Sequence, residues 1–465
     1  MRLQIEKLVY GGDGLARLPA ERVSEQTPAR GKAVFIPFTL AAEQVEASIT
    51  EEKPGFARAH ADQIVAASPH RTDPQCPYFF RCGGCQYQHA TYEHQLDIKR
   101  EILRENVRRI AKLELSCEIQ THPSPPWNYR NRCRLQVRTS CGFQAGYFKF
   151  ASRDLLPVEH CPISSPLINR AIAALWQAGR ACLPEGLNEI EFFADGEDEK
   201  LLVEMRCSGE AKASSLRNWA EELMKAMPQI AGSAIFHTNS RGVGEPLAAI
   251  GAQTQTYRTR HSDFRVSSGS FFQVNRFLVD ELVDIVAAGN SGEVALDLYA
   301  GVGLFSAALA CDFRHVISVE SSQIAAHDLS YNLPSNGRPI CSATDEYLLP
   351  LVSGFARADA GHWPAQSPSS KSKGPGRTGK FPRRSFHKPD LIVVDPPRGG
   401  LGQRVAHALA SVHAPRVTYV SCDPATLARD LVPMLAAGYR IEELHFVDLF
   451  PQTYHLESVV KLLKG

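Results

Sequence analysis

The chain has 465 residues, enough for two to four domains, and its 44% hydrophobic and 22% charged residues are typical of a globular protein rather than a disordered or membrane one. No apolar run reaches the length of about 18 residues that a membrane span needs, and the N-terminus lacks the apolar core of a signal peptide, so we expect a cytoplasmic protein without membrane contacts. The net charge of +1 does not by itself indicate a nucleic-acid partner, and 12 cysteines are too few for a disulfide scaffold.

Residues 1–68 are predicted to be all-β. Apolar and polar residues alternate in short bursts at 32–37 and 44–49, and a glycine-rich turn at 11–14 separates earlier strand segments. A compact five-stranded barrel is the expected closure for so short a β segment.

Three cysteines form a C-x5-C-x-x-C pattern within residues 69–90: Cys76, Cys82 and Cys85. Clustered thiols in a reducing compartment favour a metal site, and Gly-Gly inside the C-x-x-C makes three unrelated cysteines a weak explanation. The spacing fits zinc and an iron–sulfur cluster equally well, and either needs a fourth thiolate.

Residues 91–113 are predicted to form one helix, because Leu96, Leu103, Val107 and Ile110 recur at helical spacing. Residues 120–265 alternate strands and helices without a nucleotide signature. Within them, 129–138 is predicted to be a strand with arginines on its polar face.

From about residue 266 the pattern becomes strand, glycine-rich turn, helix and strand, which predicts a doubly wound, Rossmann-like α/β domain. Residues 353–388 are rich in Ser, Pro, Gly, Lys and Arg, with Asp359 as their only acid, and we expect a disordered basic insertion there. The chain is therefore divided into a β segment (1–68), a central α+β domain (69–265) and a C-terminal α/β domain (266–465).

A candidate cofactor site follows the strand at 294–298. It contains a D-x-x-x-G-x-G turn, in which Gly301 and Gly303 allow the backbone to turn sharply close to a ligand. About twenty residues later a second strand ends in Glu320, whose carboxylate can bind both ribose hydroxyls. Because the turn lacks G-x-G-x-x-G, S-adenosylmethionine is favoured over a dinucleotide, and a plain tight turn with a surface acid is the alternative.

Two later strands end in candidate catalytic groups. The strand at 389–394 ends in Asp395-Pro396-Pro397-Arg398, a rigid tip where a substrate base could lie. The strand at 416–421 ends in Cys422, and Asp423-Pro424 then caps and starts a helix. Ligands bind at this edge of a parallel sheet, and a helix N-terminus favours a thiolate, so Cys422 is predicted to be a nucleophile rather than a structural cysteine.

A nucleophile of this kind suits methyl transfer to C5 of uracil, a carbon that is itself a poor nucleophile. Attack of a thiolate at C6 produces an enolate whose C5 can take the methyl group from a sulfonium, and a base must then remove the C5 proton. Glu457, before a last apolar strand, is the candidate base, although taken alone it could be an ordinary surface acid.

These motifs resemble the bacterial RNA 5-methyluridine methyltransferase family, which modifies 23S rRNA and tRNA, over nearly the whole chain. The resemblance implies that Cys422 of S-C-D-P is the nucleophile and Glu457 of H-x-E-S-V the proton-abstracting base. It also implies four cofactor-pocket residues, the first of them in F-x-Q-V-N: Gln273, Tyr299, Glu320 and Asp395. Leu304 stands where the family often has Asn, and Asp345 is a looser match to a late pocket position.

The same resemblance implies a 4Fe–4S cluster, because family members with C-x5-C-G-G-C carry one, with the fourth ligand in a later H-C-P segment. That ligand is Cys161 here, with Cys133 and Cys141 as competing candidates. We expect the cluster to have a structural or RNA-contacting role, since the expected chemistry moves no electrons. Residues 1–68 resemble the TRAM domain, an RNA-binding barrel of the OB type.

The expected partner is therefore RNA, with the target base unstacked in a loop or flipped out. The resemblance favours 23S rRNA, the tRNA T-loop is the alternative, and we expect a monomer. Seven arginines are candidate phosphate contacts, although each could equally lie on a solvated face: Arg100, Arg104, Arg108, Arg109, Arg130, Arg132 and Arg134. Three other functions remain open: an amino-methyltransferase acting through D-P-P-R, an RNA cytosine-C5 methyltransferase, and a non-catalytic iron–sulfur RNA-binding protein.

Overall fold

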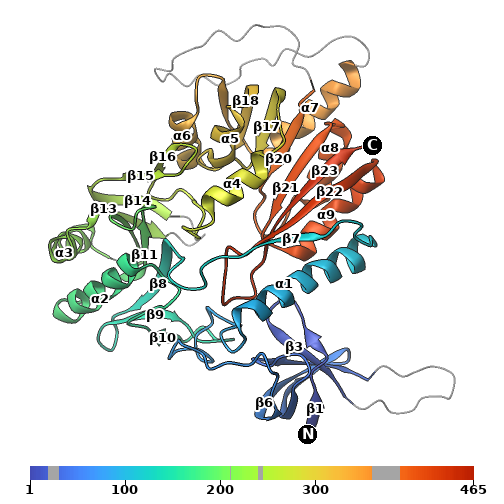
Figure 1. Cartoon of the computed structure of the whole chain (residues 1–465). Coiled ribbons are helices and arrows are strands. Elements are labelled where there is room, and N and C mark those ends of the chain that lie inside the picture. Colours follow the sequence, from blue (N-terminus) through green and yellow to red (C-terminus); the bar gives the residue numbers. More distant parts are fainter. Residues whose placement is uncertain (19–30, 210, 239–243, 359–387) are drawn as a thin grey trace, which may run out of the picture.

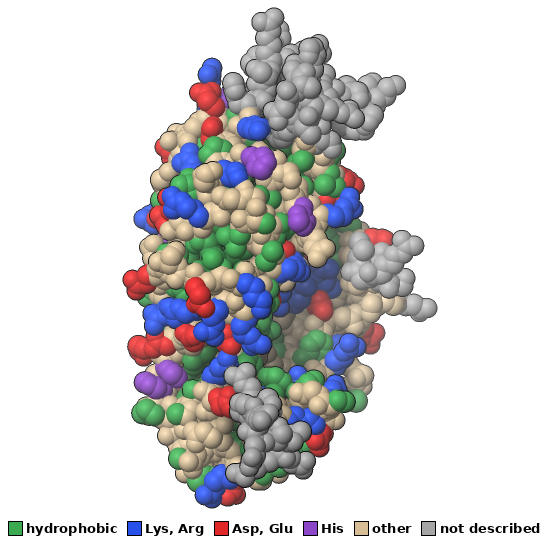
Figure 2. Space-filling model, turned by 90° about the vertical axis from the view of Figure 1, so that its right-hand side faces the viewer, with side chains coloured by type: hydrophobic (Ala, Val, Ile, Leu, Met, Phe, Trp, Pro, Cys, Tyr) green, Lys and Arg blue, Asp and Glu red, His purple; other side chains and the backbone are tan. Residues whose placement is uncertain are grey.

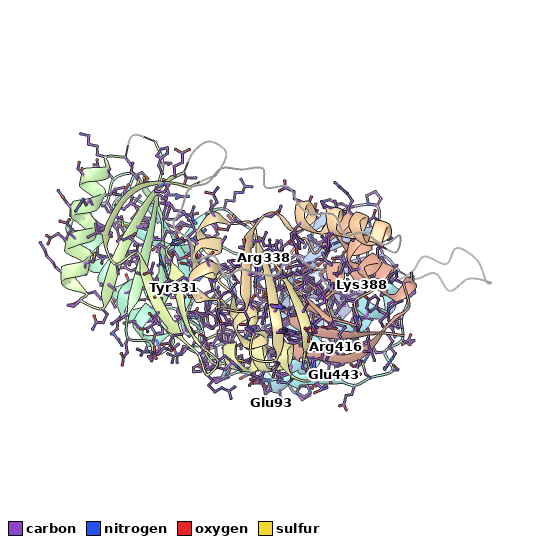
Figure 3. The ribbon with its side chains drawn as sticks, turned by 90° about the horizontal axis from the view of Figure 1, so that it is seen from above. Glu93, Tyr331, Arg338, Lys388, Arg416 and Glu443 are labelled. Atoms are coloured by element: carbon purple, nitrogen blue, oxygen red, sulfur yellow. The ribbon has the colours of Figure 1, made fainter. Side chains whose placement is uncertain are left out.

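The computed structural model describes residues 1–18, 31–209, 211–238, 244–358 and 388–465 (Figure 1). Three large sheets and a two-stranded hairpin organise these residues. Viewed from above, the central sheet and the C-terminal sheet stand side by side (Figure 3). No helix in the described ranges is long and apolar enough to cross a membrane.

The N-terminal barrel is built from β1 (Arg2–Gln4), β2 (Lys7–Leu8), β3 (Asp13–Arg17), β4 (Ala33–Pro37), β5 (Gln44–Glu52) and β6 (Phe56–Ala66). Its order is β1-β5-β6-β4-β3-β2. The amide of Ile5 donates to the Glu43 carbonyl next to β5, and the amide of Glu6 donates to the Leu15 carbonyl in β3. One bent first strand thus pairs with both ends of the sheet and closes it. The bend divides that strand, so six strands stand where five were predicted.

The predicted helix at 91–113 is observed as α1 (Tyr92–Asn106), which continues into the π-helical turn η1 (Val107–Ala111). Leu103 and Val107 are fully buried, whereas Ile110 is 39% exposed, so the apolar face ends before the last predicted position. The left-handed residue Lys112 then ends the helix.

The central sheet has the order β10-β9-β8-β11-β12-β13-β14. Its strands are β8 (Arg132–Arg138), β9 (Gln144–Phe148), β10 (Leu155–Pro157), β11 (Leu187–Ala194), β12 (Leu201–Cys207), β13 (Ile230–Thr238) and β14 (Gly244–Gly251). Helices α2 (Pro166–Ala181) and α3 (Ala213–Ala226) cover one face of this sheet (Figure 1). The arginines of β8 alternate with core residues and therefore lie on the other face, as predicted for this strand.

The hairpin β15 (Thr254–Arg258) and β16 (Asp263–Ser267) leads to the C-terminal sheet, whose order is β19-β18-β17-β20-β21-β23-β22-β7. Its strands are β17 (Gly292–Leu298), β18 (Phe313–Glu320), β19 (Gly337–Cys341), β20 (Leu391–Val394), β21 (Arg416–Ser421), β22 (Tyr439–Val447), β23 (Glu457–Lys464) and β7 (Ile119–His122). The five strands from β17 to β21 are parallel, and β23 is antiparallel to both of its neighbours. This is the doubly wound α/β arrangement that the sequence predicts.

Helices cover both faces of the C-terminal sheet. α4 (Val279–Ala287) and α5 (Leu304–Leu309) pack on one face. α7 (Thr344–Ala358), α8 (Gly402–Val412) and α9 (Pro424–Ala436) pack on the other, together with α1. α6 (Gln323–Asn332) packs near β16, β18 and β19. The carboxyl ends of the parallel strands remain open between these layers, which is where ligands bind in such sheets.

Two sequence-based boundaries differ from the structure. β7 pairs in parallel with β22, so residues 119–122 extend the C-terminal sheet although the sequence placed them in the central domain. α7 runs to Ala358, so the helix includes residues 353–358 of the predicted disordered insertion. Most of that predicted insertion, 359–387, lies outside the described residues.

Candidate active site

The turn after β17 holds the Glu320 carboxylate at the edge of the sheet. The Gly301 amide donates to Glu320 Oε2 at 2.9 Å, and the Ser322 amide donates to Glu320 Oε1 at 2.6 Å. Tyr299 and Gly301 both have positive φ, 65° and 57°, and a Cβ on Gly301 would meet no atom within 4 Å. The turn is therefore open above its glycine, as a close-approaching ligand requires.

The acid of the D-x-x-x-G-x-G motif lies beneath this turn rather than in it. Asp297 is fully buried, and the Ser306 hydroxyl donates to it at 2.5 Å. Burial raises the pKa of Asp297 to about 7, with the Glu320 carboxylate adding to the effect. Asp297 thus supports the first turn of α5.

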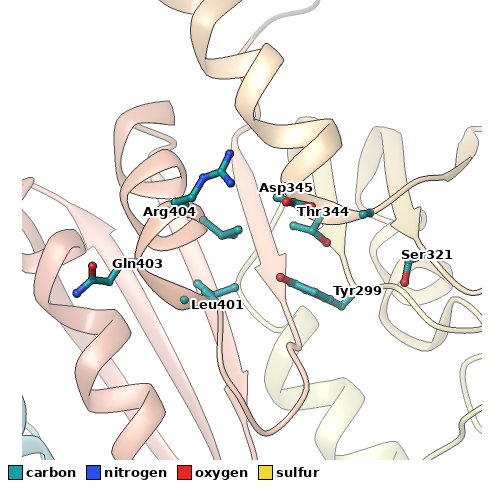
Figure 4. A pocket seen from close by; sticks show the side chains of 10 residues that line it. Tyr299, Ser321, Thr344, Asp345, Leu401, Gln403 and Arg404 are labelled. Atoms are coloured by element: carbon teal, nitrogen blue, oxygen red, sulfur yellow. The ribbon is translucent and has the colours of Figure 1, made fainter. Parts of the chain in front are cut away.

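A cavity of about 600 Å³ opens beside Tyr299. Thr344 and Asp345 line one side of the cavity, and Gln403 and Arg404 at the start of α8 line the other (Figure 4). The looser sequence match at Asp345 therefore lies in the same cavity as Tyr299. A cavity with a tyrosine ring and a few polar groups suits a nucleoside-sized ligand.

Gln273 and Asp395 come together from distant parts of the chain. The Gln273 side-chain amide donates to Asp395 Oδ2 at 3.5 Å. Asp395 follows β20, and burial together with the nearby Asp297 raises its pKa to about 7. Two of the four predicted cofactor residues are thus direct neighbours, and Asp395 also links them to the catalytic pair described next.

Cys422 and Glu457 lie across from each other at the open end of the antiparallel pair β21 and β23. The last paired residues are Ser421 and Ser458, so Cys422 and Glu457 occupy the next position on each strand. Residues opposite each other on paired strands point to the same face, which directs the thiol and the carboxyl to one site. Glu457 is only 4% exposed.

The charges around this pair act on both groups. Burial raises the pKa of Cys422 to about 12, with Glu457 and Asp395 adding to the rise and Arg398 opposing it. Burial and Asp395 likewise hold the pKa of Glu457 well above its usual range, again opposed by Arg398. Asp395 thus raises the pKa of both Cys422 and Glu457, and Arg398 is the cation that favours the ionised forms of these two groups.

The N-terminus of α9 was expected to favour the thiolate form of Cys422, but the pKa of this thiol is raised instead. Asp423 caps α9 as predicted, but its carboxylate accepts hydrogen bonds from the Ala425 and Thr426 amides. The positive end of the helix is therefore compensated by Asp423, and burial determines the direction of the Cys422 pKa.

The loop from β22 to Glu457 is held by the segment that follows the cysteines. The amides of Gln86 and Tyr87 both donate to the Gln452 carbonyl at 3.0 Å. The Gln95 side chain on α1 donates to Gln452 Oε1 and accepts from the Gln452 amide, each at 3.0 Å. The loop predicted before the last strand is thus fixed from two other segments.

Comparison with known families decides to which family the chain belongs. The chain matches the family described as tRNA (Uracil-5-)-methyltransferase over residues 91–339 and 384–465, and the TRAM domain over residues 1–61. The chain belongs to the RNA (uracil-5-)-methyltransferase family. It is an enzyme that uses S-adenosylmethionine to methylate C5 of uracil in RNA, and it carries an N-terminal TRAM domain.

Relatives of this methyltransferase match over more than nine-tenths of their length. An uncharacterised RNA methyltransferase of Aquifex aeolicus is 29% identical, covering 99% of this chain and 98% of the relative. The 23S rRNA (uracil(1939)-C(5))-methyltransferase RlmD of Pseudomonas fluorescens is 28% identical, covering 98% and 93%. The structure of Pyrococcus abyssi tRNA (uracil-54, C5)-methyltransferase with S-adenosyl-L-homocysteine shares the fold, with a TM-score of 0.69 and 22% identity across 100% of both chains.

The four predicted cluster cysteines of the methyltransferase, Cys76, Cys82, Cys85 and Cys161, lie near one another. Burial raises the pKa of Cys76, Cys82 and Cys85, and in each case the neighbouring Cys161 raises it further. Cys133 is affected by Cys161 alone among the cysteines, and Cys141 is exposed. In the part of the chain that the structure describes, no three or more His, Cys, Asp or Glu side chains are arranged to hold a metal ion.

The predicted RNA-contacting arginines are mostly engaged with acids. Arg132 lies 3.4 Å from Glu191 and 4.1 Å from the Phe193 ring centre, so it is part of the central sheet and the phosphate-contact prediction is wrong for it. Arg134 also pairs with Glu191, at 2.8 Å. On α1 two pairs are exposed and only weakly favourable, so their arginines can still exchange an acid for a phosphate: Arg100–Asp97 and Arg104–Glu101. Arg109 in η1 is exposed and lies 3.5 Å from the largely buried Glu105.

Two residues near the catalytic pair were not singled out from the sequence. Arg398 is part of the quoted D-P-P-R tip, and its position after Asp395 was the available signal. Tyr10 lies in the TRAM barrel, and its hydroxyl donates to the Cys422 carbonyl at 3.4 Å. No pattern in the sequence links residues 412 positions apart.

Proposed function

We propose that Cys422 adds to C6 of the target uracil and that Glu457 removes the proton from C5. The observation that carries this proposal is the position of the two residues, directly opposite each other beyond the last pair of β21 and β23. A thiol and a buried carboxyl on one face of the sheet can reach adjacent carbons of one ring.

The proposed reaction has three stages: addition of the thiolate, methyl transfer and elimination. Cys422, having lost its thiol proton to solvent, attacks as the thiolate: a bond forms between Sγ and C6, and the electrons of the C5–C6 double bond move into an enolate. S-adenosylmethionine, when bound, supplies the electrophilic methyl group that C5 takes. Glu457 then accepts the C5 proton, the double bond re-forms, and the Cys422 thiolate leaves. Arg398 favours the ionised forms of both residues, because it opposes the rise in their pKa values.

We further propose that Gln273, Tyr299, Glu320 and Asp395 bind S-adenosylmethionine. Glu320 is held by the Gly301 and Ser322 amides and keeps lone pairs free for ribose hydroxyls. Tyr299 lines the cavity of about 600 Å³ next to the turn. Gln273 and Asp395 lie between this turn and Cys422, which is the place for the methionine end of the cofactor.

For the substrate we propose 23S rRNA, with the tRNA T-loop as the alternative. The full-length likeness to RlmD of Pseudomonas fluorescens supports rRNA, and the Pyrococcus abyssi likeness shows the fold alone. Lys and Arg side chains gather around a hollow in the middle of one face of the molecule (Figure 2), and such a surface suits an RNA backbone. Methylation of 23S rRNA but not tRNA transcripts by the purified enzyme is expected, and the reverse result would support the alternative.

We also propose that Cys76, Cys82, Cys85 and Cys161 hold a 4Fe–4S cluster. Cys76, Cys82 and Cys161 all raise the pKa of the buried Cys85, and the site lies among apolar residues that would exclude water, such as Phe79 and Ile163. In a cubane each thiolate binds a different iron, so the sulfurs stand farther apart than around one zinc ion. The likeness of C-x5-C-G-G-C to the pattern of cluster-bearing family members favours the cluster over zinc.

The fourth cluster ligand can be tested without measuring methylation. Iron and acid-labile sulfide are measured in protein purified without oxygen, together with the cluster's visible absorption. Cys161→Ser is expected to lose iron, whereas Cys133→Ser and the exposed control Cys141→Ser are expected to retain it. Loss of iron in Cys133→Ser alone would assign the fourth ligand to Cys133.

The catalytic proposal is tested with RNA containing 5-fluorouridine. Fluorine at C5 cannot leave as a cation, so the methylated adduct stays attached to the nucleophile. Wild-type enzyme is expected to form a denaturation-resistant RNA adduct on the peptide containing Cys422, and Cys422→Ala to form none while still binding cofactor and RNA. An adduct on another residue, or none in folded wild-type enzyme, would contradict the mechanism.

A further inference from the structure

The TRAM barrel reaches the catalytic strand through the turn between β2 and β3. Tyr10 in this turn donates its hydroxyl to the Cys422 carbonyl at 3.4 Å. The phenol is also close to the Asp423 carboxylate, and burial followed by Asp423 raises its pKa well above the usual range. The hydroxyl therefore keeps its proton and remains a donor to the segment that carries the nucleophile.

The Tyr10 ring also contacts the loop that leads to the base. Its centre lies 5.4 Å from the Tyr454 ring, with the two rings edge to face. Tyr454 in turn packs on His455 at 4.2 Å, and Arg398 donates to His455 at 3.2 Å. A series of side-chain contacts therefore links Tyr10 of the barrel to the groups around the Cys422 thiol and the Glu457 carboxyl.

The turn itself is closely packed and has little freedom to move. Gly12 has a φ of 98°, and a Cβ there would lie 2.9 Å from Gln86 Cβ and 3.6 Å from Tyr454 Cβ. Next to it, Leu8 and Leu40 of the barrel are buried against α1 and the segment after the cysteines. The barrel is therefore docked rigidly at this point, unlike a module on a flexible linker.

We propose that Tyr10 is a positioning residue for Cys422, so that the TRAM barrel completes the catalytic site in addition to contacting RNA. The hydroxyl fixes the peptide of Cys422 at the end of β21, and the ring fixes the loop before Glu457 from the same side. This inference rests on the proposed role of Cys422. It implies that removing the hydroxyl slows the reaction of bound RNA without weakening RNA binding.

The test compares Tyr10→Phe with wild-type enzyme and with Tyr331→Phe. Tyr331 is 69% exposed on α6, which packs near β16, β18 and β19, so its variant removes a hydroxyl from a different part of the sheet than β21. Single-turnover methylation at saturating RNA and S-adenosylmethionine is expected to fall about fivefold to tenfold in Tyr10→Phe, which is the effect of one hydrogen bond. The dissociation constant for RNA and the melting temperature of Tyr10→Phe are expected to match those of wild type. In Tyr331→Phe the single-turnover rate, the dissociation constant and the melting temperature are all expected to match wild type.

A second variant moves the turn and leaves Tyr10 in place. Gly12→Ala pushes the turn away from Gln86 and Tyr454, so the same slowing at saturating RNA is expected. The alkylation rate of the Cys422 peptide by iodoacetamide without RNA, followed by mass spectrometry, is expected to change in both variants. A merely structural role would leave this rate unchanged.

The outcomes separate this inference from the proposed function. If wild-type enzyme forms no 5-fluorouridine adduct, the role of Cys422 fails first. If it forms the adduct and Tyr10→Phe reacts at the wild-type rate, Tyr10 does not position the nucleophile. Weaker RNA binding with an unchanged rate at saturation would make Tyr10 an RNA contact and overturn the inference.

Discussion

The Lys99 ammonium and the Asp448 carboxylate lie 2.7 Å apart with both side chains fully buried, and they join α1 to the residue after β22. Lys99 also donates to the Phe450 carbonyl at 2.9 Å, and the Tyr92 hydroxyl donates to Asp448 at 2.9 Å. These hydrogen bonds offset part of the cost of removing the two charges from water. The pair thereby fixes the start of the loop that leads to Glu457.

Replacement of Lys99 is expected to destabilise the enzyme strongly. Lys99→Met leaves the Asp448 carboxylate buried without its cation, which costs about 3–5 kcal/mol of unfolding free energy. Arg104→Met on the same helix is the control, because its pair with Glu101 is exposed and such pairs contribute about 0.3–0.5 kcal/mol. Urea denaturation measures the unfolding free energy of both variants. Similar losses of stability in the two would contradict the structural role given to the buried Lys99–Asp448 pair.

Removal of the base is expected to separate adduct formation from product release. In Glu457→Gln the thiol of Cys422 can still add and C5 can still be methylated, but no carboxylate takes the C5 proton. Turnover is expected to fall by about 10²- to 10⁴-fold, and a covalent protein–RNA complex is expected to accumulate on unmodified RNA. Gel electrophoresis under denaturing conditions detects this complex, whose absence would argue that Glu457 acts before methyl transfer.

The rate of methylation is expected to rise with pH between about pH 7 and 9, because the attacking form of Cys422 is the thiolate and burial raises the pKa of this thiol to about 12. Arg398 opposes this rise at Cys422, so Arg398→Ala is expected to move the profile to higher pH and lower the rate at pH 7.5 by about threefold to tenfold. Arg398→Lys retains the charge and is the control. A profile that is unchanged in Arg398→Ala would show that the cation does not act on the nucleophile.

Glu320→Gln is expected to weaken S-adenosylmethionine binding about tenfold or more, since a charged acceptor of ribose hydroxyls is replaced by a neutral one. Glu293→Gln is the matched control, because Glu293 lies in β17 near the opposite end of the sheet and pairs with the exposed Arg314. Calorimetric titration of each variant with S-adenosylhomocysteine measures the effect. Equal affinities in the two variants would place the ribose elsewhere.

Features that depend on local chain geometry could be predicted from the sequence. The turn at Gly301 and the strand end at Glu320 follow from an apolar strand, glycine and helix in succession. Asp423 and Pro424 start α9 because an Asp cap and a first-turn proline satisfy free amides locally. The doubly wound α/β fold class follows from the repeated succession of strand, turn and helix along residues 266–465.

Features that depend on the neighbours of a residue required the folded structure. From the sequence Arg132 is a candidate phosphate contact or part of a solvated face, but Glu191, from a strand about sixty residues later, pairs with it. The thiolate predicted for Cys422 is opposed by burial and by the carboxyls of Glu457 and Asp395. The pairing of Arg132 and the ionisation of Cys422 both depend on side chains that become neighbours only when the chain folds.

The sequence by itself determined the order of strands, turns and caps, and the residue types at each strand end, because hydrophobic periodicity and turn chemistry act within a few residues. Only the tertiary structure decided that β7 joins the last sheet, that Glu457 lies across from Cys422, and that Tyr10 of the barrel contacts the nucleophile segment. These contacts depend on packing between segments that are tens to hundreds of residues apart. No local pattern encodes them, because the free energy that favours them comes from burying apolar surfaces between whole elements.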